Sequence, residues 1–210
     1  MPALQLQTYR YQSVLIEYYA PDPIEVQVAY VTLLEKDPQA PFPFWTKVWP
    51  SAQALAQFLI DHPEYIAGKK VMELAAGLAL PALVAARFAS HVECSDYLPE
   101  AVAVIQGSVA HNRLQNVDCR VRNWASMPKG VHIDILLLSD VNYAPEQFEA
   151  LYKMMKWFLT AGVVILLATP HRLAARSFLD HILPWVVLRE EIPIQEQQGQ
   201  TMISIFLLQK

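Results

Sequence analysis

Two acidic residues, Glu73 and Asp96, each end a short apolar segment and flank a turn of small residues at Ala75, Ala76 and Gly77. Small side chains let a ligand approach the backbone of a turn closely. A carboxylate at the end of the second segment, about 20 residues beyond the turn, is placed to accept hydrogen bonds from the hydroxyl groups of a ribose. The spacing therefore predicts a nucleoside-binding site on these residues.

A third acidic residue, Asp140, follows the run at 133–138, which is apolar except at Asp134, and begins a D-x-x-Y sequence that ends at Tyr143. Such a run is typical of a central parallel strand that is buried on both faces. Ligands of open α/β sheets bind at the carboxyl ends of the strands, so we expect chemistry at Asp140 and Tyr143. The alternative for Asp140 is a structural role as the cap of the next helix.

The elements around the first two acids have a recognisable layout. Apolar runs that predict strands alternate with an alanine-rich run that predicts a helix. Strand, tight turn, helix, strand and acid is the order of a nucleotide-binding βαβ unit. The phosphate-binding pattern G-x-G-x-x-G has three glycines where this turn has only Gly77, so a nucleoside cofactor fits better than NAD. An ordinary turn without a ligand is the alternative.

The rest of the chain continues the alternation of strands and helices. Residues 4–34 carry aromatic and β-branched residues around a Pro-Asp-Pro turn, which predicts an antiparallel hairpin. Residues 37–50 are too rich in proline for a helix and predict an ordered aromatic loop, which either caps the core or closes over a cofactor. Further helices are expected at 52–60, from after residues 97–100 to about 111, at 146–159 and at 171–181, and strands at 119–121, 162–168, 183–191 and 201–208.

Length and composition favour a globular protein. The 210 residues are 54% hydrophobic and 17% charged, which suits a chain with a sizeable core. A net charge of −4 argues against a nucleic-acid partner, and no run approaches the roughly 20 apolar residues of a membrane span. The start has no secretory signature, and neither the two cysteines nor the six histidines show metal-ligand spacing. We therefore expect a cytoplasmic protein without a metal site.

Together the motifs resemble those of the class I, seven-β-strand S-adenosylmethionine-dependent methyltransferases. The first motif of that class, E-x-G-x-G-x-G, aligns with residues 73–79, where Ala75 and Ala79 replace two glycines. The run FWTKVWPSAQALAQFL at 44–59 and the D-x-x-Y element at 140–143 are similar to those of its protein-lysine-methyltransferase-like members. The resemblance covers roughly residues 42–210.

The resemblance implies an α/β fold with a Rossmann-like, doubly wound sheet. Seven strands would lie in the order 3-2-1-4-5-7-6, with the last strand antiparallel and helices on both faces. Residues 1–40 would form an N-terminal β-hairpin extension and residues 41–210 the methyltransferase domain. The protein would be a monomer that binds S-adenosylmethionine and methylates a protein lysine side chain. The alternatives are a small-molecule N- or O-methyltransferase and a cofactor-binding protein without catalysis.

The resemblance also implies roles for particular residues. Asp140 would orient the acceptor amine, and Tyr143 with Trp49 would wall its channel. A lysine amine has an ordinary pKa of about 10.4, so burial beside aromatic rings must favour its neutral form. Asn123 would accept from the adenine amino group and Trp124 would stack on the base, unless Trp124 only fills the core. The residues expected to bind the cofactor are Trp49, Glu73, Ala75, Gly77, Asp96, Tyr97, Asn123, Trp124 and Asp140.

Overall fold

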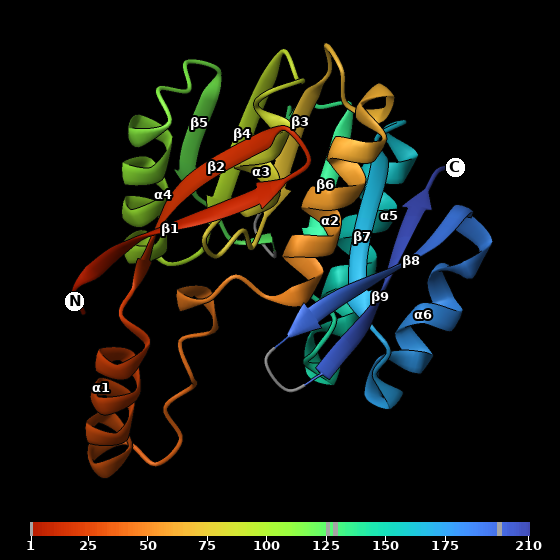
Figure 1. The fold of residues 1–210 in the computed structure, drawn as a ribbon. Helices are drawn as coiled ribbons and strands as arrows, with labels where there is room; N and C mark the ends of the chain where they lie inside the picture. Colours follow the sequence, from red (N-terminus) through yellow and green to blue (C-terminus); the bar gives the residue numbers. More distant parts are fainter. Residues whose placement is uncertain (1, 125–126, 128–129, 197–198) are drawn as a thin grey trace.

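The main sheet of the computed structural model has seven strands (Figure 1). The structure describes residues 2–124, 127, 130–196 and 199–210. The strands are β3 (Lys70–Leu74), β4 (His91–Asp96), β5 (Val117–Val121), β6 (Ile135–Ser139), β7 (Val164–Pro170), β8 (Val186–Glu196) and β9 (Gly199–Leu208). They lie in the order β5-β4-β3-β6-β7-β9-β8, and β9 runs antiparallel to both of its neighbours. The predicted fold class and strand order are confirmed.

Helices cover both faces of this sheet. One face packs against α2 (Pro50–Asp61), α3 (Leu80–Ala85) and α4 (Pro99–His111), and the other against α5 (Phe148–Thr160) and α6 (Arg176–Ile182). Successive side chains of β6 alternate between the two cores, with Leu137 in the first and Leu136 and Leu138 in the second. A central strand must be apolar on both faces, which explains why residues 135–138 are all hydrophobic.

An N-terminal hairpin of β1 (Leu4–Tyr11) and β2 (Val14–Pro21) packs beside the first of these cores. Ile16 is fully buried there. The Ser108 hydroxyl on α4 accepts a hydrogen bond from the Tyr19 backbone N–H at 3.0 Å, and the Asn112 side chain accepts one from Glu17 at 3.2 Å. The predicted hairpin is thus present and docks on α4.

The position predicted for the hairpin turn is wrong. The chain turns at Gln12, which has φ 49°, and the Pro-Asp-Pro sequence instead begins α1 (Pro23–Lys36). The Asp22 carboxylate accepts hydrogen bonds from the backbone N–H groups of Ile24 and Glu25 at 2.9 and 3.0 Å. An aspartate cap followed by proline at the first helical position is a strong helix start. This local signal outweighs the strand preference of the valines that follow.

The topology gathers the predicted site residues at one edge of the sheet. β3 pairs with β4 on one side and with β6 on the other, all in parallel. Their carboxyl ends therefore meet, and they carry the small-residue turn, Asp96 and Asp140, respectively. Strand order reverses direction between β3 and β6, which is where open α/β sheets bind ligands.

Candidate functional site

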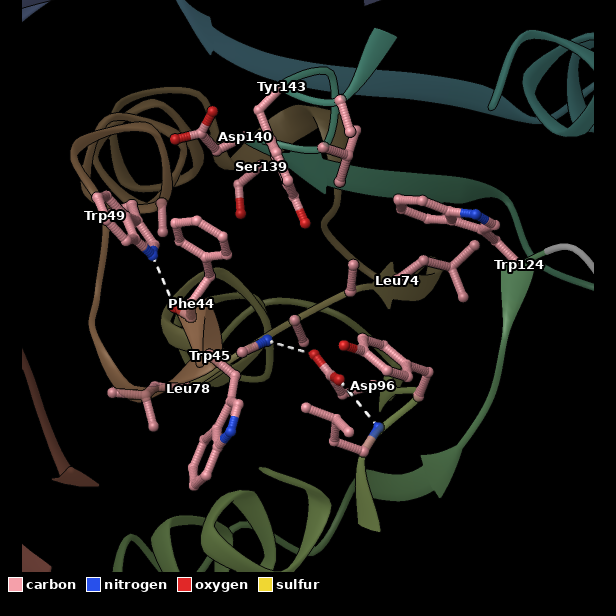
Figure 2. Close-up of a pocket in the computed structure, with 18 of the residues that line it drawn as sticks. Phe44, Trp45, Trp49, Leu74, Leu78, Asp96, Trp124, Ser139, Asp140 and Tyr143 are labelled. Carbon is pink, nitrogen blue, oxygen red and sulfur yellow. Dashed lines mark hydrogen bonds between the residues drawn. The ribbon is translucent and has the colours of Figure 1, made fainter. Parts of the chain in front are cut away.

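A cavity of about 880 Å³ opens at the carboxyl ends of β3, β4 and β6 (Figure 2). This volume lies within the range typical of small-molecule sites. Its walls come from the turn after β3, the segments that follow β4, β5 and β6, and the aromatic loop before α2. The predicted site residues that line it are Trp49, Ala75, Gly77, Asp96, Tyr97, Asn123, Trp124, Asp140 and Tyr143.

The turn after β3 keeps the shape of a glycine-rich turn although two glycines are replaced. Ala75, Gly77 and Ala79 all lie in the left-handed region, with φ of 53°, 57° and 57°. Glycine adopts this conformation freely, whereas each alanine carries about 1–2 kcal/mol of strain. A Cβ on Gly77 would lie 3.5 Å from the Trp45 carbonyl oxygen, an ordinary contact, so backbone conformation rather than space favours glycine there.

Asp96 is buried at the end of β4, with its carboxylate on the cavity (Figure 2). One oxygen accepts a hydrogen bond from the Gly77 N–H at 3.0 Å, and the other accepts from the Leu98 N–H at 3.1 Å. Burial raises the pKa of this carboxyl, and the backbone donors oppose the rise. Each carboxylate oxygen has a further lone pair, so Asp96 can also accept two hydroxyl groups. The residue therefore fits the ribose of a nucleoside cofactor.

Glu73 is not among the residues that line the cavity. It is fully buried below the turn, where its Oε2 accepts a hydrogen bond from the Ala82 N–H of α3 at 2.8 Å. Its Oε1 has no hydrogen-bond partner among the described residues. Burial, opposed by the Ala82 N–H and reinforced by Asp96, raises the pKa of Glu73 to about 8. Through this hydrogen bond, Glu73 links the end of β3 to the first turn of α3.

Aromatic rings form one end of the cavity, and Trp124 lies at the other (Figure 2). The Phe44 ring lies 5.4 Å from that of Tyr143 and 5.9 Å from that of Trp49. The Trp49 indole N–H donates to the Phe44 carbonyl oxygen at 2.8 Å. Burial, with Tyr97 and Asp140 nearby, raises the pKa of the Tyr143 hydroxyl. The aromatic loop thus contributes a wall of the cavity, and Tyr143 stays protonated at neutral pH.

Asp140 begins the turn after β6 in a left-handed conformation with φ 56°. Its backbone N–H donates to the Ala168 carbonyl oxygen at 2.9 Å. Its carboxylate accepts two hydrogen bonds from the Arg172 guanidinium, one of them 3.0 Å long between Nη2 and Oδ2. Neither the short 3-10 helix at Pro145–Gln147 nor α5 has a side-chain cap among the described residues, so the helix-capping alternative is not observed.

Sequence reasoning did not identify Arg172 as part of this site. Arg172 follows the end of β7, so the same rule about carboxyl ends of strands could have found it. Asn142 is fully buried in the D-x-x-Y turn, and neither amide atom has a hydrogen-bond partner among the described residues.

Within the described part of the chain, no group of three or more His, Cys, Asp or Glu could hold a metal ion. Nor is any described helix long and apolar enough to cross a membrane.

Comparison with known proteins gives a family match over most of the chain. The sequence model of a family described as lysine methyltransferase matches residues 44–184. The histone-arginine methyltransferase METTL23 of Rattus norvegicus is 36% identical over 110 residues, which are 50% of this chain and 49% of the relative. The electron transfer flavoprotein beta subunit lysine methyltransferase of Danio rerio is 32% identical over 144 residues, 67% of this chain and 54% of the relative. The chain thus spans about half the length of these curated relatives.

A solved structure shows the same fold. The N-methyltransferase NodS of Bradyrhizobium japonicum WM9, in complex with S-adenosyl-L-homocysteine, matches with a TM-score of 0.60 at 13% identity. The match covers 85% of this chain and 98% of NodS. At that identity it shows the fold and not the substrate.

Proposed function

This chain belongs to the lysine methyltransferase family of S-adenosylmethionine-dependent enzymes, and we propose that it methylates the side-chain amine of a lysine in a protein. The observation that carries the proposal is one cavity with two different ends. The carboxylate of Asp96 serves a ribose, while Asp140 and the rings of Phe44 and Tyr143 suit an amine. A methyl donor and its acceptor can therefore meet within one cavity.

The residues on the cofactor side fit S-adenosylmethionine. Asp96 would accept the ribose hydroxyls, and the backbone of the small-residue turn at Ala75 and Gly77 would pass close to the methionyl part. Asn123 and Trp124 would contact the adenine. The bound cofactor supplies a methyl group activated by its sulfonium, so the protein has only to bind, orient and exclude water.

The residues on the acceptor side fit a neutral amine. Contact with the rings of Phe44, Trp49 and Tyr143 would displace water from an entering lysine head group, which lowers its pKa, so that the proton leaves to solvent before the lone pair attacks. Asp140 would accept a hydrogen bond from the amine and hold its lone pair toward the methyl group. Alignment of donor and acceptor accounts for most of the acceleration expected of such a site.

The named relatives favour a protein acceptor. One acts on a lysine of an electron transfer flavoprotein subunit, and the other is a histone-arginine methyltransferase. Arginine is therefore the second candidate. Lysine is favoured because an amine can lose its proton, whereas a guanidinium stays charged in proteins.

Transfer of a labelled methyl group tests the proposal. The protein is incubated with methyl-labelled S-adenosylmethionine and a cell lysate, and the label in precipitated protein is compared with that in small molecules. The expected result is label in protein that an amino-acid hydrolysate recovers as methylated lysine. Label only in small molecules would contradict a protein acceptor. Label recovered as methylated arginine would contradict lysine and support arginine, the second candidate.

A further inference from the structure

Arg172 makes a two-pronged contact with the residue that would face the acceptor. Its guanidinium donates through Nη1 to Oδ1 and through Nη2 to Oδ2 of Asp140, and both residues line the cavity. The side chain of Asp140 is only 11% exposed, and that of Arg172 is 35% exposed. A planar guanidinium that binds both oxygens fixes the plane of the carboxylate as well as its position.

The segment that carries Arg172 is itself held by the two edge strands next to β7. The neighbouring His171 Nε2 lies 2.9 Å from the Ser204 hydroxyl on β9 and 3.0 Å from a carboxylate oxygen of Glu191 on β8. Arg189 lies 2.7 Å from the other oxygen of Glu191. These contacts of His171 restrict the backbone next to Arg172, so the base of the Arg172 side chain has a fixed position.

The turn that carries Asp140 needs such support. Asp140 has a positive φ, a conformation that is strained for a residue with a Cβ. Among the described residues, the remaining hydrogen bond of Asp140 is the one that its backbone N–H donates to the Ala168 carbonyl oxygen, which does not orient the side chain. Without the guanidinium the carboxylate could rotate, and a displacement of about 1 Å at a reacting centre can lower a rate about 100-fold.

We propose that Arg172 is the positioning residue of the methyl-transfer site: it holds the Asp140 carboxylate in the one orientation that directs a neutral amine toward the methyl group. The inference rests on the proposed function for its kinetic consequence. The pair also carries no net charge, so the site binds an amine without locking it as an ammonium in an ion pair. Lysine at this position would keep the charge and lose the two-pronged geometry.

The test compares Arg172→Lys, Arg172→Met and Arg172→Ala with Arg176→Met, which removes an exposed arginine four residues away. For the Arg172 variants we expect kcat to fall about 10- to 100-fold while S-adenosylhomocysteine affinity in calorimetry stays within about threefold of wild type. Arg176→Met should match wild type in kcat and in S-adenosylhomocysteine affinity. Millimolar guanidinium chloride should restore part of the lost kcat to Arg172→Ala, which a purely structural role would not produce. Wild-type kcat in Arg172→Met would overturn the inference, as would an Arg172→Ala enzyme that guanidinium cannot rescue.

A second measurement does not depend on turnover. Melting temperatures of Asp140→Asn, Arg172→Met and the double variant form a double-mutant cycle. We expect the two shifts to be non-additive by about 2–4 °C, because either substitution already breaks the pair. Additive shifts would overturn the inference even if methyl transfer to lysine is found. Non-additive shifts without any methyl transfer would instead reject the proposed function and leave the pairing intact.

Discussion

The buried carboxyl of Glu73 should make the stability of this protein depend on pH. Its pKa is about 8 in the folded chain against an ordinary value of 4.5, because burial disfavours the charged form. A raised folded pKa means that the folded chain binds the proton more tightly than the unfolded chain does. The stabilising contribution is therefore complete below about pH 4.5, decreases as pH rises, and is lost above about pH 8. Between these two limits the contribution changes by about 5 kcal/mol.

Glu73→Gln tests this reasoning, because a glutamine keeps an oxygen for the Ala82 N–H and cannot ionise. Urea unfolding of both proteins at about pH 5 and about pH 9 gives the change in unfolding free energy, and the difference between the two proteins cancels all other titrating groups. We expect wild type to lose about 4 kcal/mol relative to Glu73→Gln over this range, because the carboxyl of the unfolded chain is already largely ionised at pH 5. Glu64→Gln, at an exposed position, is the control and should follow wild type. Parallel pH dependences of wild type and Glu73→Gln would refute the reasoning.

Further predictions concern cofactor binding and the acceptor wall. Asp96→Ala should weaken S-adenosylhomocysteine binding by about 1–3 kcal/mol in calorimetry, because the ribose loses a charged acceptor, and unchanged affinity would place the ribose elsewhere. Ala79→Gly should leave cofactor affinity equal or improved, because relief of about 1–2 kcal/mol of backbone strain offsets the loss of a buried methyl group. A large loss of cofactor affinity would show that this methyl group packs against the ligand. Tyr143→Phe should lower kcat less than Asp140→Asn, because the ring wall remains; equal losses would assign the hydroxyl a role in the reaction.

The edge of the sheet that carries the site could be predicted from the sequence pattern, whereas the strand order came from the family resemblance. Apolar runs of period two or without a break fix which segments are strands, and parallel strands bring Asp96 and Asp140 to one edge whatever the details of packing. The face of β3 on which the Glu73 side chain lies could also have been predicted from sequence. It shares its face of β3 with Val71 in the first core, whereas Met72 and Leu74 point to the second.

Two kinds of feature were not predicted from sequence: a segment in which helix and strand signals compete, and a contact between residues that are far apart in the sequence. The helix α1 forms because the Asp22 cap and the following proline outweigh β-branched residues that favour a strand. The contact between Asp140 and Arg172 joins residues 32 apart in the sequence, and no spacing rule links them. Left-handed alanines at 75 and 79 could be suspected from the aligned glycines, but only the backbone shows them.

The most direct test of the proposed function is methyl transfer by wild type and Asp140→Asn, measured by mass spectrometry of an acceptor protein with trideuteromethyl-labelled S-adenosylmethionine. The predicted result is label on lysine Nζ with wild type, and a turnover about 100-fold lower in Asp140→Asn, with cofactor affinity close to wild type and a melting temperature lowered by only about 2–4 °C. Wild-type turnover in Asp140→Asn would contradict the assignment of the acceptor site, and label on any atom other than a lysine Nζ would contradict the proposed acceptor.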